Sequence, residues 1–287
     1  MTHLILQAPN LNTERIENIA AVARARGVQN LSTTAVRLLD IDPGESQELK
    51  QLCDNLHVDY AFLDEVRPLH ECKILAMDMD STLINIECID EIADMAGRKA
   101  QVSAITEAAM RGEITDFAES LRRRVALLEG VPATALEQVY EERLRLNAGA
   151  ETLIQAAKKA GLKVLLVSGG FTFFTEKLKQ RLGLDQAHAN LLETANGVLT
   201  GKVLGDIVDA QGKAQRLQDL ARETGAQAHQ IIALGDGAND LKMLALADYS
   251  VAYRAKPVVR AQANFALNVS GLDAVLNWFD IPGVVKY

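Results

Sequence analysis

The chain has 287 residues, of which 48% are apolar and 24% charged, and its formal charge is −8 at pH 7. This length is ample for a buried core and favours two domains or one elaborated domain. The net negative charge argues against nucleic acid or an anionic membrane surface as the main partner. No apolar run approaches the ~18 residues of a membrane span, and the start lacks a signal-peptide pattern, so we expect a cytoplasmic protein.

Cysteine and histidine usage argues against a zinc or iron–sulfur site. The three cysteines (Cys53, Cys72, Cys88) have no C-x-x-C spacing, and the five histidines show no paired spacing. Zinc sites usually need such clustered thiolate or imidazole ligands. We therefore expect reduced cysteines with structural or incidental roles.

Residues 1–70 alternate between strand and helix patterns. The apolar segments HLILQA, TTAVRLLDI and VDYAFLDEV are separated by the helical segments NTERIENIAAVARARG and GESQELKQLCDNL. This alternation predicts a small β-α-β-α-β domain, and RPLHE has the composition of a linker to the rest of the chain.

A second unit begins with the predicted strand KILAMDM. After this strand the alternation of strands and helices stops, because residues 87–146 show only helical periodicity. Asp116 is expected to cap one of these helices, which would end near Gly130. From residue 147 the alternation of helices and strands returns, and two short segments around ETANG resemble a hairpin. The pattern predicts a parallel α/β core of residues 73–86 and 147–287, with 87–146 inserted as a helical cap.

Three predicted strands end in polar segments, LAMDMDST, LLVSGGFT and IALGDGAND. Each segment alone is compatible with an ordinary turn or helix cap, and D-x-D alone is also compatible with a sugar-nucleotide metal motif. A calcium loop is excluded because Leu83 and Ile89 stand where glycine and glutamate are required. Ligands of open parallel sheets bind at the carboxyl ends of the strands, so we expect the three segments to share one crevice.

The side chains at these strand ends suit a metal and a phosphoryl group. Asp78 and Asp236 offer the hard oxygen ligands that Mg²⁺ prefers. Ser168 and the amides of Gly169 and Gly170 offer hydrogen-bond donors to phosphoryl oxygens.

Two cationic residues are expected to point inward. Arg124 falls in or beside the apolar stripe of its predicted helix, whereas Arg122 and Arg123 point away from it. Lys213 shares a face with the apolar residues of its own helix, and Glu87 heads the first cap helix. A structural ion pair, a packed lysine stem and a helix-dipole effect remain alternative explanations for these three residues.

In order, DMDST, VSGG, Lys213 and GDGAND resemble the four motifs of the haloacid dehalogenase superfamily of aspartate-nucleophile phosphotransferases. The longer stretches DMDSTLINIECIDEIA, SLRRRVALLEG, VSGGFT and LGDGANDLKML resemble the phosphoserine phosphatase family within it. The resemblance covers residue 73 to the C-terminus. It implies a Rossmann-like, doubly wound parallel sheet with an inserted helical cap, and hydrolysis of O-phospho-L-serine to serine and phosphate, the last step of serine biosynthesis.

The resemblance also implies catalytic roles. Asp78 would be the nucleophile that forms an aspartyl phosphate, and Asp80 the general acid and base. Mg²⁺, held by the Asp78 and Asp236 carboxylates and the Asp80 carbonyl, would act with Lys213 to offset the repulsion between carboxylate and phosphate. Asp240 would orient Lys213 or a metal-bound water.

Substrate recognition is implied in the same way. Glu87 would pair with the substrate ammonium and Arg124 with its carboxylate. The remaining contacts implied are phosphoryl binding by Ser168, Gly169 and Gly170, apolar walls from Met110 and Phe117, and a substrate contact from Asn239.

Some members of this family carry an N-terminal regulatory domain of the ACT type, with the order β-α-β-β-α-β. The predicted unit has one strand fewer, which indicates a shortened ACT-like domain. Serine feedback, packing and homodimer formation are alternative roles for it. For the whole chain, phosphoryl transfer to another acceptor such as homoserine, and a non-enzymatic amino-acid sensor, are the competing hypotheses.

Overall fold

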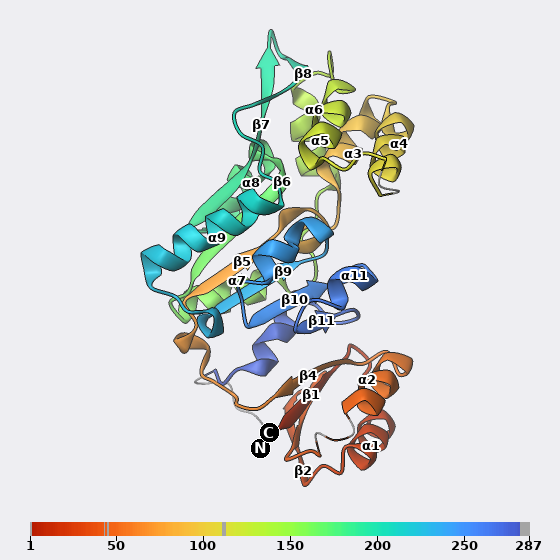
Figure 1. The fold of residues 1–287 in the computed structure, drawn as a ribbon, viewed down its shortest axis with the longest axis vertical. Coiled ribbons are helices and arrows are strands. Elements are labelled where there is room, and N and C mark those ends of the chain that lie inside the picture. Colours follow the sequence, from red (N-terminus) through yellow and green to blue (C-terminus); the bar gives the residue numbers. More distant parts are fainter. Residues whose placement is uncertain (1, 43, 45, 111–112, 282–287) are drawn as a thin grey trace.

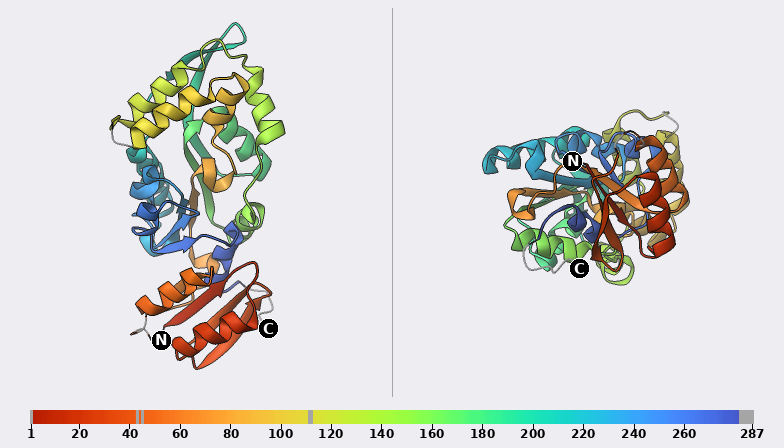
Figure 2. Two further views of the ribbon diagram at one scale, coloured as in Figure 1. Left: turned by 90° about the vertical axis from the view of Figure 1, so that its right-hand side faces the viewer. Right: turned by 90° about the horizontal axis from the view of Figure 1, so that it is seen from below.

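A computed structural model describes residues 2–42, 44, 46–110 and 113–281. The molecule is elongated, with a small sheet at one end, a large sheet in the middle and a group of helices at the other end (Figure 1). A side view shows the same three parts along the long axis (Figure 2, left). No helix within the described ranges is both long and apolar enough to cross a membrane.

The small N-terminal sheet has four strands, not the three expected. Its elements in chain order are β1 (His3–Gln7), α1 (Thr13–Val22), β2 (Gly27–Ser32), β3 (Ala35–Leu39), α2 (Ser46–Asn55) and β4 (Asp59–Leu63). The antiparallel order β2-β3-β1-β4 leaves β2 at an edge, where it pairs with β3. Sequence reasoning missed β2 because most of its side chains are exposed or half-buried, so it lacks a strong apolar pattern. The β-α-β-β-α-β order is complete, and the expectation of a shortened unit is wrong.

The two faces of the small sheet pack differently. Leu4 and Leu6 join the core beneath α1 and α2, whereas Ile5 and Ala61 belong to the core of the large sheet. Asp59 of β4 stabilises this contact, and the residue is only 3% exposed. Its carboxylate accepts hydrogen bonds from the backbone N–H groups of residues 268–270 at 2.7, 3.1 and 2.8 Å. The small sheet is therefore held directly against the large one.

The large sheet has the order β11-β10-β9-β5-β6-β7-β8. Its strands are β5 (Ile74–Met77), β6 (Lys163–Phe171), β7 (Gln186–Ala195), β8 (Val198–Leu204), β9 (Ile231–Gly235), β10 (Tyr249–Tyr253) and β11 (Phe265–Leu267). All neighbours are parallel except β7 and β8, which form the expected hairpin. Asn196 and Gly197 turn it, both with positive φ (52° and 78°). Sequence reasoning missed β11, which has only three residues.

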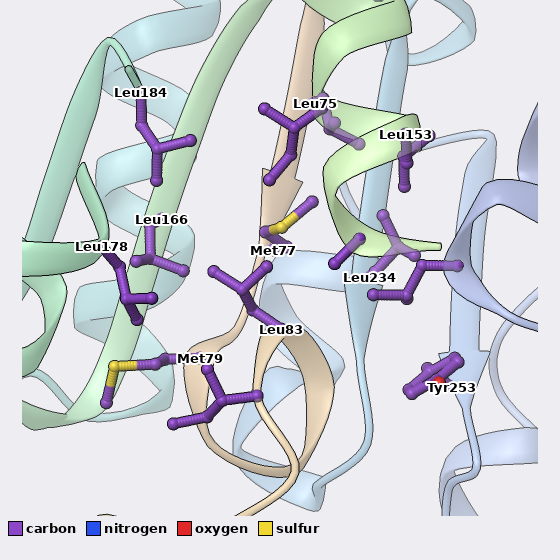
Figure 3. Close-up of a cluster of buried hydrophobic side chains, with 14 of the residues drawn as sticks. Leu75, Met77, Met79, Leu83, Leu153, Leu166, Leu178, Leu184, Leu234 and Tyr253 are labelled. Carbon is purple, nitrogen blue, oxygen red and sulfur yellow. The ribbon is translucent and has the colours of Figure 1, made fainter. Parts of the chain in front are cut away.

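Helices cover both faces of this sheet, as a doubly wound fold requires. Leu75, Met77, Leu166 and Leu234 point to one face, where they meet Leu153 and Leu178 (Figure 3). These last two come from α7 (Ala150–Lys159) and α8 (Thr172–Leu182). The alternate strand residues point to the other face, beneath α9 (Ala210–Thr224), α10 (Leu241–Leu244) and α11 (Pro257–Arg260). This two-sided burial explains the continuous apolar runs of the strands.

The helical insert follows β5 after one short helical turn, η3 (Met79–Leu83). It comprises α3 (Cys88–Met95), α4 (Lys99–Met110), α5 (Phe117–Ala126), α6 (Thr134–Gln138) and η4 (Val139–Arg143). Its two connections lie side by side, because Ile84 pairs with Leu146 and the N–H of Asn85 donates to the carbonyl of Arg145 at 3.0 Å. The far side of the insert is tied to β8, where Leu199 exchanges backbone hydrogen bonds with Gly130 and Val131. The insert therefore covers the carboxyl end of β5.

Candidate active site

The three polar strand ends come together because β9, β5 and β6 are neighbours in the sheet. Asp78 follows β5, Asp236 follows β9, and Ser168 lies near the end of β6. A cavity of about 840 Å³ opens between these strand ends and the helical insert. The predicted residues that line it are Asp78, Asp80, Glu87, Phe117, Arg124, Ser168, Gly169, Gly170, Asp236 and Asn239. Met110 lies outside the residues whose side chains the structure describes.

Asp78 is placed by the end of β5 and by the turn that follows it. Its Oδ1 accepts a hydrogen bond from the N–H of Met79 at 2.7 Å and lies 2.8 Å from Nζ of Lys213. Burial raises the pKa of Asp78 well above its usual range, and the nearby Asp240 carboxylate raises it further, against the opposing effect of Lys213. The ionised form of Asp78 therefore depends on added positive charge.

Lys213 lies beneath the cavity in the first turn of α9. Asp209 begins this helix by accepting a hydrogen bond from the N–H of Gly212 at 2.8 Å. The Lys213 side chain is fully buried, with Nζ 2.8 Å from Asp78 and 2.7 Å from Asp240. Burial alone would lower the pKa of Lys213, but the Asp240 and Asp78 carboxylates outweigh it and raise the pKa. Lys213 is thus a charged partner of the carboxylates and not a packed aliphatic stem.

A cluster of three carboxylates can hold a metal ion. Asp78, Asp236 and Asp240 each offer an oxygen, and these atoms lie within 4.8 Å of one another. Lys213 supplies one positive charge against three negative ones, so a divalent cation fits the remaining charge, and the all-oxygen donor set suits a hard cation. Burial and the Asp240 carboxylate raise the pKa of Asp236 to about 6. Sequence reasoning did not include Asp240 among the metal ligands.

Two further hydrogen bonds hold the carboxylates of Asp236 and Asp240 in position. The Thr82 hydroxyl donates to Asp236 at 3.0 Å, and the N–H of Gly237 donates to Oδ2 of Asp240 at 3.0 Å. Thr82 was missed because a threonine in a loop carries no sequence signal beyond its place after D-x-D. Asp240 was expected to orient Lys213 or a metal-bound water, and in the structure Nζ of Lys213 donates to Oδ1 of Asp240 at 2.7 Å.

The Asp80 carboxyl lies close to Gly170, in the turn of β6. Its Oδ1 accepts a hydrogen bond from the N–H of Cys88 at 3.2 Å. Burial, followed by repulsion from Glu87, raises the pKa of Asp80 to about 7. A carboxyl group with this pKa can give and accept a proton near neutral pH, as a general acid and base must.

The two glycines of the β6 turn permit close approaches on both sides. A Cβ added at Gly169 would lie 2.9 Å from the ring of Phe117, and one added at Gly170 would lie 2.6 Å from Oδ2 of Asp80. The N–H of Gly170 donates to Oγ of Ser168 at 2.8 Å. The turn is therefore packed tightly between Asp80 and the insert.

If Asp80 is the general acid and base that the sequence predicts, Gly170→Ala should lower kcat for phosphoserine hydrolysis by roughly 10²–10⁴-fold. The new methyl group would displace the Asp80 carboxyl from its position. The matched control is Gly27→Ala, where the added Cβ would make only an ordinary contact at 3.5 Å with Leu39. Steady-state kinetics and melting temperature of both variants check this. Full activity in Gly170→Ala would contradict the placement of Asp80.

Arg124 projects from α5 toward the cavity. Its neighbours Leu121 and Val125 are buried, Arg122 and Arg123 are exposed, and Arg124 is half-buried, as the helical periodicity predicts. Its Nε donates weakly to the Ser120 carbonyl at 3.4 Å. Burial lowers the pKa of Arg124, while the carboxylates of Asp90, Glu87 and Asp80 oppose that shift.

Glu87 and Asp90 complete the charged wall of the insert. Glu87 precedes α3 and accepts a hydrogen bond from the Ser81 hydroxyl at 2.6 Å. Asp90 also lines the cavity and was missed by sequence reasoning. The spacing of three residues between Glu87 and Asp90 was the available signal, because residues three apart on a helix share a face.

Two family models and a curated relative match long stretches of this chain. A family model of haloacid dehalogenase-like hydrolases matches residues 75–245, and one for a domain of unknown function (DUF4072) matches residues 4–49. The chain is 58% identical over 212 residues to a phosphoserine phosphatase of Polaromonas sp., a match that covers 72% of this chain and 90% of that protein.

Solved structures of phosphoserine phosphatases also superpose on this chain. The unliganded crystal structure of a probable phosphoserine phosphatase from Vibrio cholerae superposes with a TM-score of 0.83 at 38% identity, covering 96% of this chain and 85% of that one. A phospho-aspartyl intermediate analogue of phosphoserine phosphatase superposes with a TM-score of 0.68, also at 38% identity, and covers 73% of this chain and 99% of that one.

Proposed function

Because the chain belongs to the phosphoserine phosphatase family of the haloacid dehalogenase-like hydrolases, we propose that it hydrolyses O-phospho-L-serine to L-serine and phosphate. The observation that carries this proposal is the composition of the cavity. One wall, formed by the core, holds Asp78 and Asp80 with Ser168, and a second wall, formed by the insert, holds Glu87 and Arg124. The first wall suits a phosphoryl group, and the second suits an amino acid.

In the first step, an oxygen of Asp78 attacks phosphorus and the bond from phosphorus to the serine oxygen breaks. Asp80 gives its proton to the departing serine oxygen, for which its pKa of about 7 is suited. Lys213, 2.8 Å from Asp78, offsets the repulsion between the carboxylate and the phosphate. At an effective dielectric of 20, that repulsion is about 4 kcal/mol for unit charges ~4 Å apart.

In the second step, water attacks the aspartyl phosphate at phosphorus. Asp80, now ionised, takes a proton from this water, and the bond from phosphorus to Asp78 breaks to release phosphate and restore the carboxylate. Ser168 and the N–H of Gly169 hold phosphoryl oxygens through both steps. Asp240, 2.7 Å from Nζ of Lys213, keeps the Lys213 ammonium in place.

The metal of this site is proposed to be Mg²⁺, held by the Asp78 and Asp236 carboxylates and the Asp80 carbonyl. When bound, it supplies positive charge that screens the phosphate from the carboxylates. The excess of buried carboxylate over Lys213 and the oxygen-only donor set support this proposal.

We expect EDTA to abolish phosphate release and added Mg²⁺ to restore it, because the uncompensated carboxylates would repel the substrate. Metal binding should also raise the melting temperature, since it relieves repulsion among Asp78, Asp236 and Asp240. Wild-type activity in excess EDTA would contradict the assignment. Addition of Ca²⁺ or Mn²⁺ in place of Mg²⁺ tests the identity of the ion.

Substrate selection is assigned to the helical insert. In this proposal Glu87 pairs with the substrate ammonium, and the Arg124 guanidinium receives the substrate carboxylate through a bidentate contact. Phe117, packed over Gly169, forms an apolar wall between the two halves of the cavity, and Asn239 contacts the substrate from the core side.

We expect Arg124→Ala to lower kcat/KM for phosphoserine by roughly 10²–10³-fold, the usual effect of removing one partner of a desolvated charge pair. Hydrolysis of p-nitrophenyl phosphate, which has no carboxylate, should change far less. Arg122→Ala is the matched control, because Arg122 is exposed on the same helix. Equal losses on both substrates in Arg124→Ala would contradict this role.

Residues 1–70 are proposed to form a separate folding domain, with the core in residues 73–86 and 147–287 and the cap in residues 87–146. The three bonds that Asp59 accepts from residues 268–270 support a packing role for the first domain.

A further inference from the structure

Asn190 is a buried polar residue that has no role in the mechanism above. It lies in β7, next to β6 (Figure 1), and only 1% of its surface is exposed. Its Nδ2 donates to the carbonyl of Gly169 at 2.8 Å, and its Oδ1 accepts from the N–H of Val208 at 2.8 Å. Since one contact needs the amide nitrogen and the other the amide oxygen, together they fix the orientation of the side chain.

The contact with Gly169 falls where the β6–β7 ladder is interrupted. Val167 pairs with His188 and Phe171 with Asn190, so three residues of β6 stand opposite a single residue of β7. A bulge of this kind removes the regular ladder partners of the extra residues. The side chain of Asn190 provides a hydrogen-bond partner for the carbonyl of Gly169, a half-buried residue of this bulge.

This bond reaches the hydroxyl of Ser168 through one peptide plane. The carbonyl of Gly169 and the N–H of Gly170 belong to the same trans peptide and point in opposite directions. Asn190 holds the carbonyl, and the N–H on the other side donates to Oγ of Ser168 at 2.8 Å. Because Oγ accepts this bond, its own hydrogen is left to donate to a group in the cavity.

The second bond of Asn190 reaches the helix that carries Lys213. Val208 directly precedes Asp209, which caps α9, and Lys213 lies in the first turn of that helix. One side chain therefore joins the phosphoryl-binding turn to the start of the lysine helix.

We propose that Asn190 is a positioning residue for the phosphoryl pocket. It holds the peptide between Gly169 and Gly170 in the orientation that presents Ser168 to the phosphoryl oxygens, and it keeps this turn in register with Lys213. The inference rests on the proposed function, which assigns this end of the cavity to the phosphoryl group. The amino-acid end, formed by Glu87 and Arg124, belongs to the insert and makes no contact with Asn190 among the described bonds.

The test uses two variants and two ligands. Asn190→Asp keeps the acceptor for Val208 but, when ionised, presents no donor to Gly169, and Asn190→Ser shortens the side chain so that its hydroxyl no longer reaches the Gly169 carbonyl, without adding charge. Binding of orthovanadate, a phosphoryl analogue, and of L-serine is measured by calorimetry with Mg²⁺ present. Both variants should bind vanadate about 10-fold more weakly, the effect of losing the hydrogen bond that orients this peptide, and bind serine as the wild type does. Asn264→Asp is the control, because Nδ2 of Asn264 donates to the Asp248 carbonyl away from the cavity.

A purely structural role would lower the melting temperature and leave vanadate binding intact, or weaken both ligands equally, and either result would overturn the proposal. If Asn190→Asp does not fold, Asn190→Ser decides the question alone. The result is separable from the proposed function: a wild type that binds vanadate but releases no phosphate from phosphoserine contradicts the function and still allows Asn190 to be tested.

Discussion

Asp78→Asn should reduce kcat for phosphoserine by on the order of 10⁴-fold or more, as removal of a nucleophile typically does. The amide keeps the shape of the carboxyl group but is a poor nucleophile. Because burial and the Asp240 carboxylate make the charged form of Asp78 unfavourable in the metal-free protein, the melting temperature in EDTA should stay unchanged or rise. Phosphate release and thermal melting measure the two effects on one preparation.

The control for this variant is Asp64→Asn. Asp64 is exposed, follows the last strand of the small sheet and accepts a hydrogen bond from the Thr2 hydroxyl. It should leave kcat unchanged. An Asp78→Asn protein that releases phosphate at the wild-type rate would remove the basis of the proposed mechanism.

Lys213→Met is expected to affect stability as well as activity. Methionine fills a similar volume but leaves Asp78 and Asp240, now without their cation, buried side by side. Removing one partner of a buried ion pair typically costs about 3–5 kcal/mol, so the free energy of unfolding should fall by that amount in metal-free buffer. Urea denaturation measures the change. Phosphate release should be lost too, because the repulsion between Asp78 and phosphate is no longer offset.

Lys242→Met is the matched control, since Lys242 is an exposed lysine whose Nζ donates to the Gln211 side chain. Its free energy of unfolding should change by less than about 0.5 kcal/mol, as for most surface substitutions. A Lys213→Met protein as stable as this control would show that the buried carboxylates do not need the lysine.

Several parts of this site were predictable from the sequence because they follow from regular geometry. Parallel strands place their carboxyl ends at one edge, so Asp78, Ser168 and Asp236 had to lie close together once their strands were recognised as neighbours. Helical periodicity likewise separated Arg124 from Arg122 and Arg123.

Other parts depend on contacts that no local pattern records. Strand β2 is polar and exposed because it lies at a sheet edge, so its apolar pattern is weak. Asn190 and Thr82 act through hydrogen bonds to groups far away in the chain, and no local sequence pattern marks a single polar residue that makes such a bond. Asp240 joins the metal cluster only because Gly235 permits a close approach: a Cβ there would lie 2.5 Å from the Asp240 side chain.

The central claim is that Asp78 carries the phosphoryl group during hydrolysis. The most direct test is an acid quench of wild-type protein turning over phosphoserine with Mg²⁺, followed by digestion and mass spectrometry of the peptide that contains residues 73–86. We expect one added phosphoryl group on Asp78, which hydroxylamine removes, and none in Asp78→Asn. A phosphoryl group on a different residue, or rapid turnover with no covalent phosphate at any residue, would contradict the account.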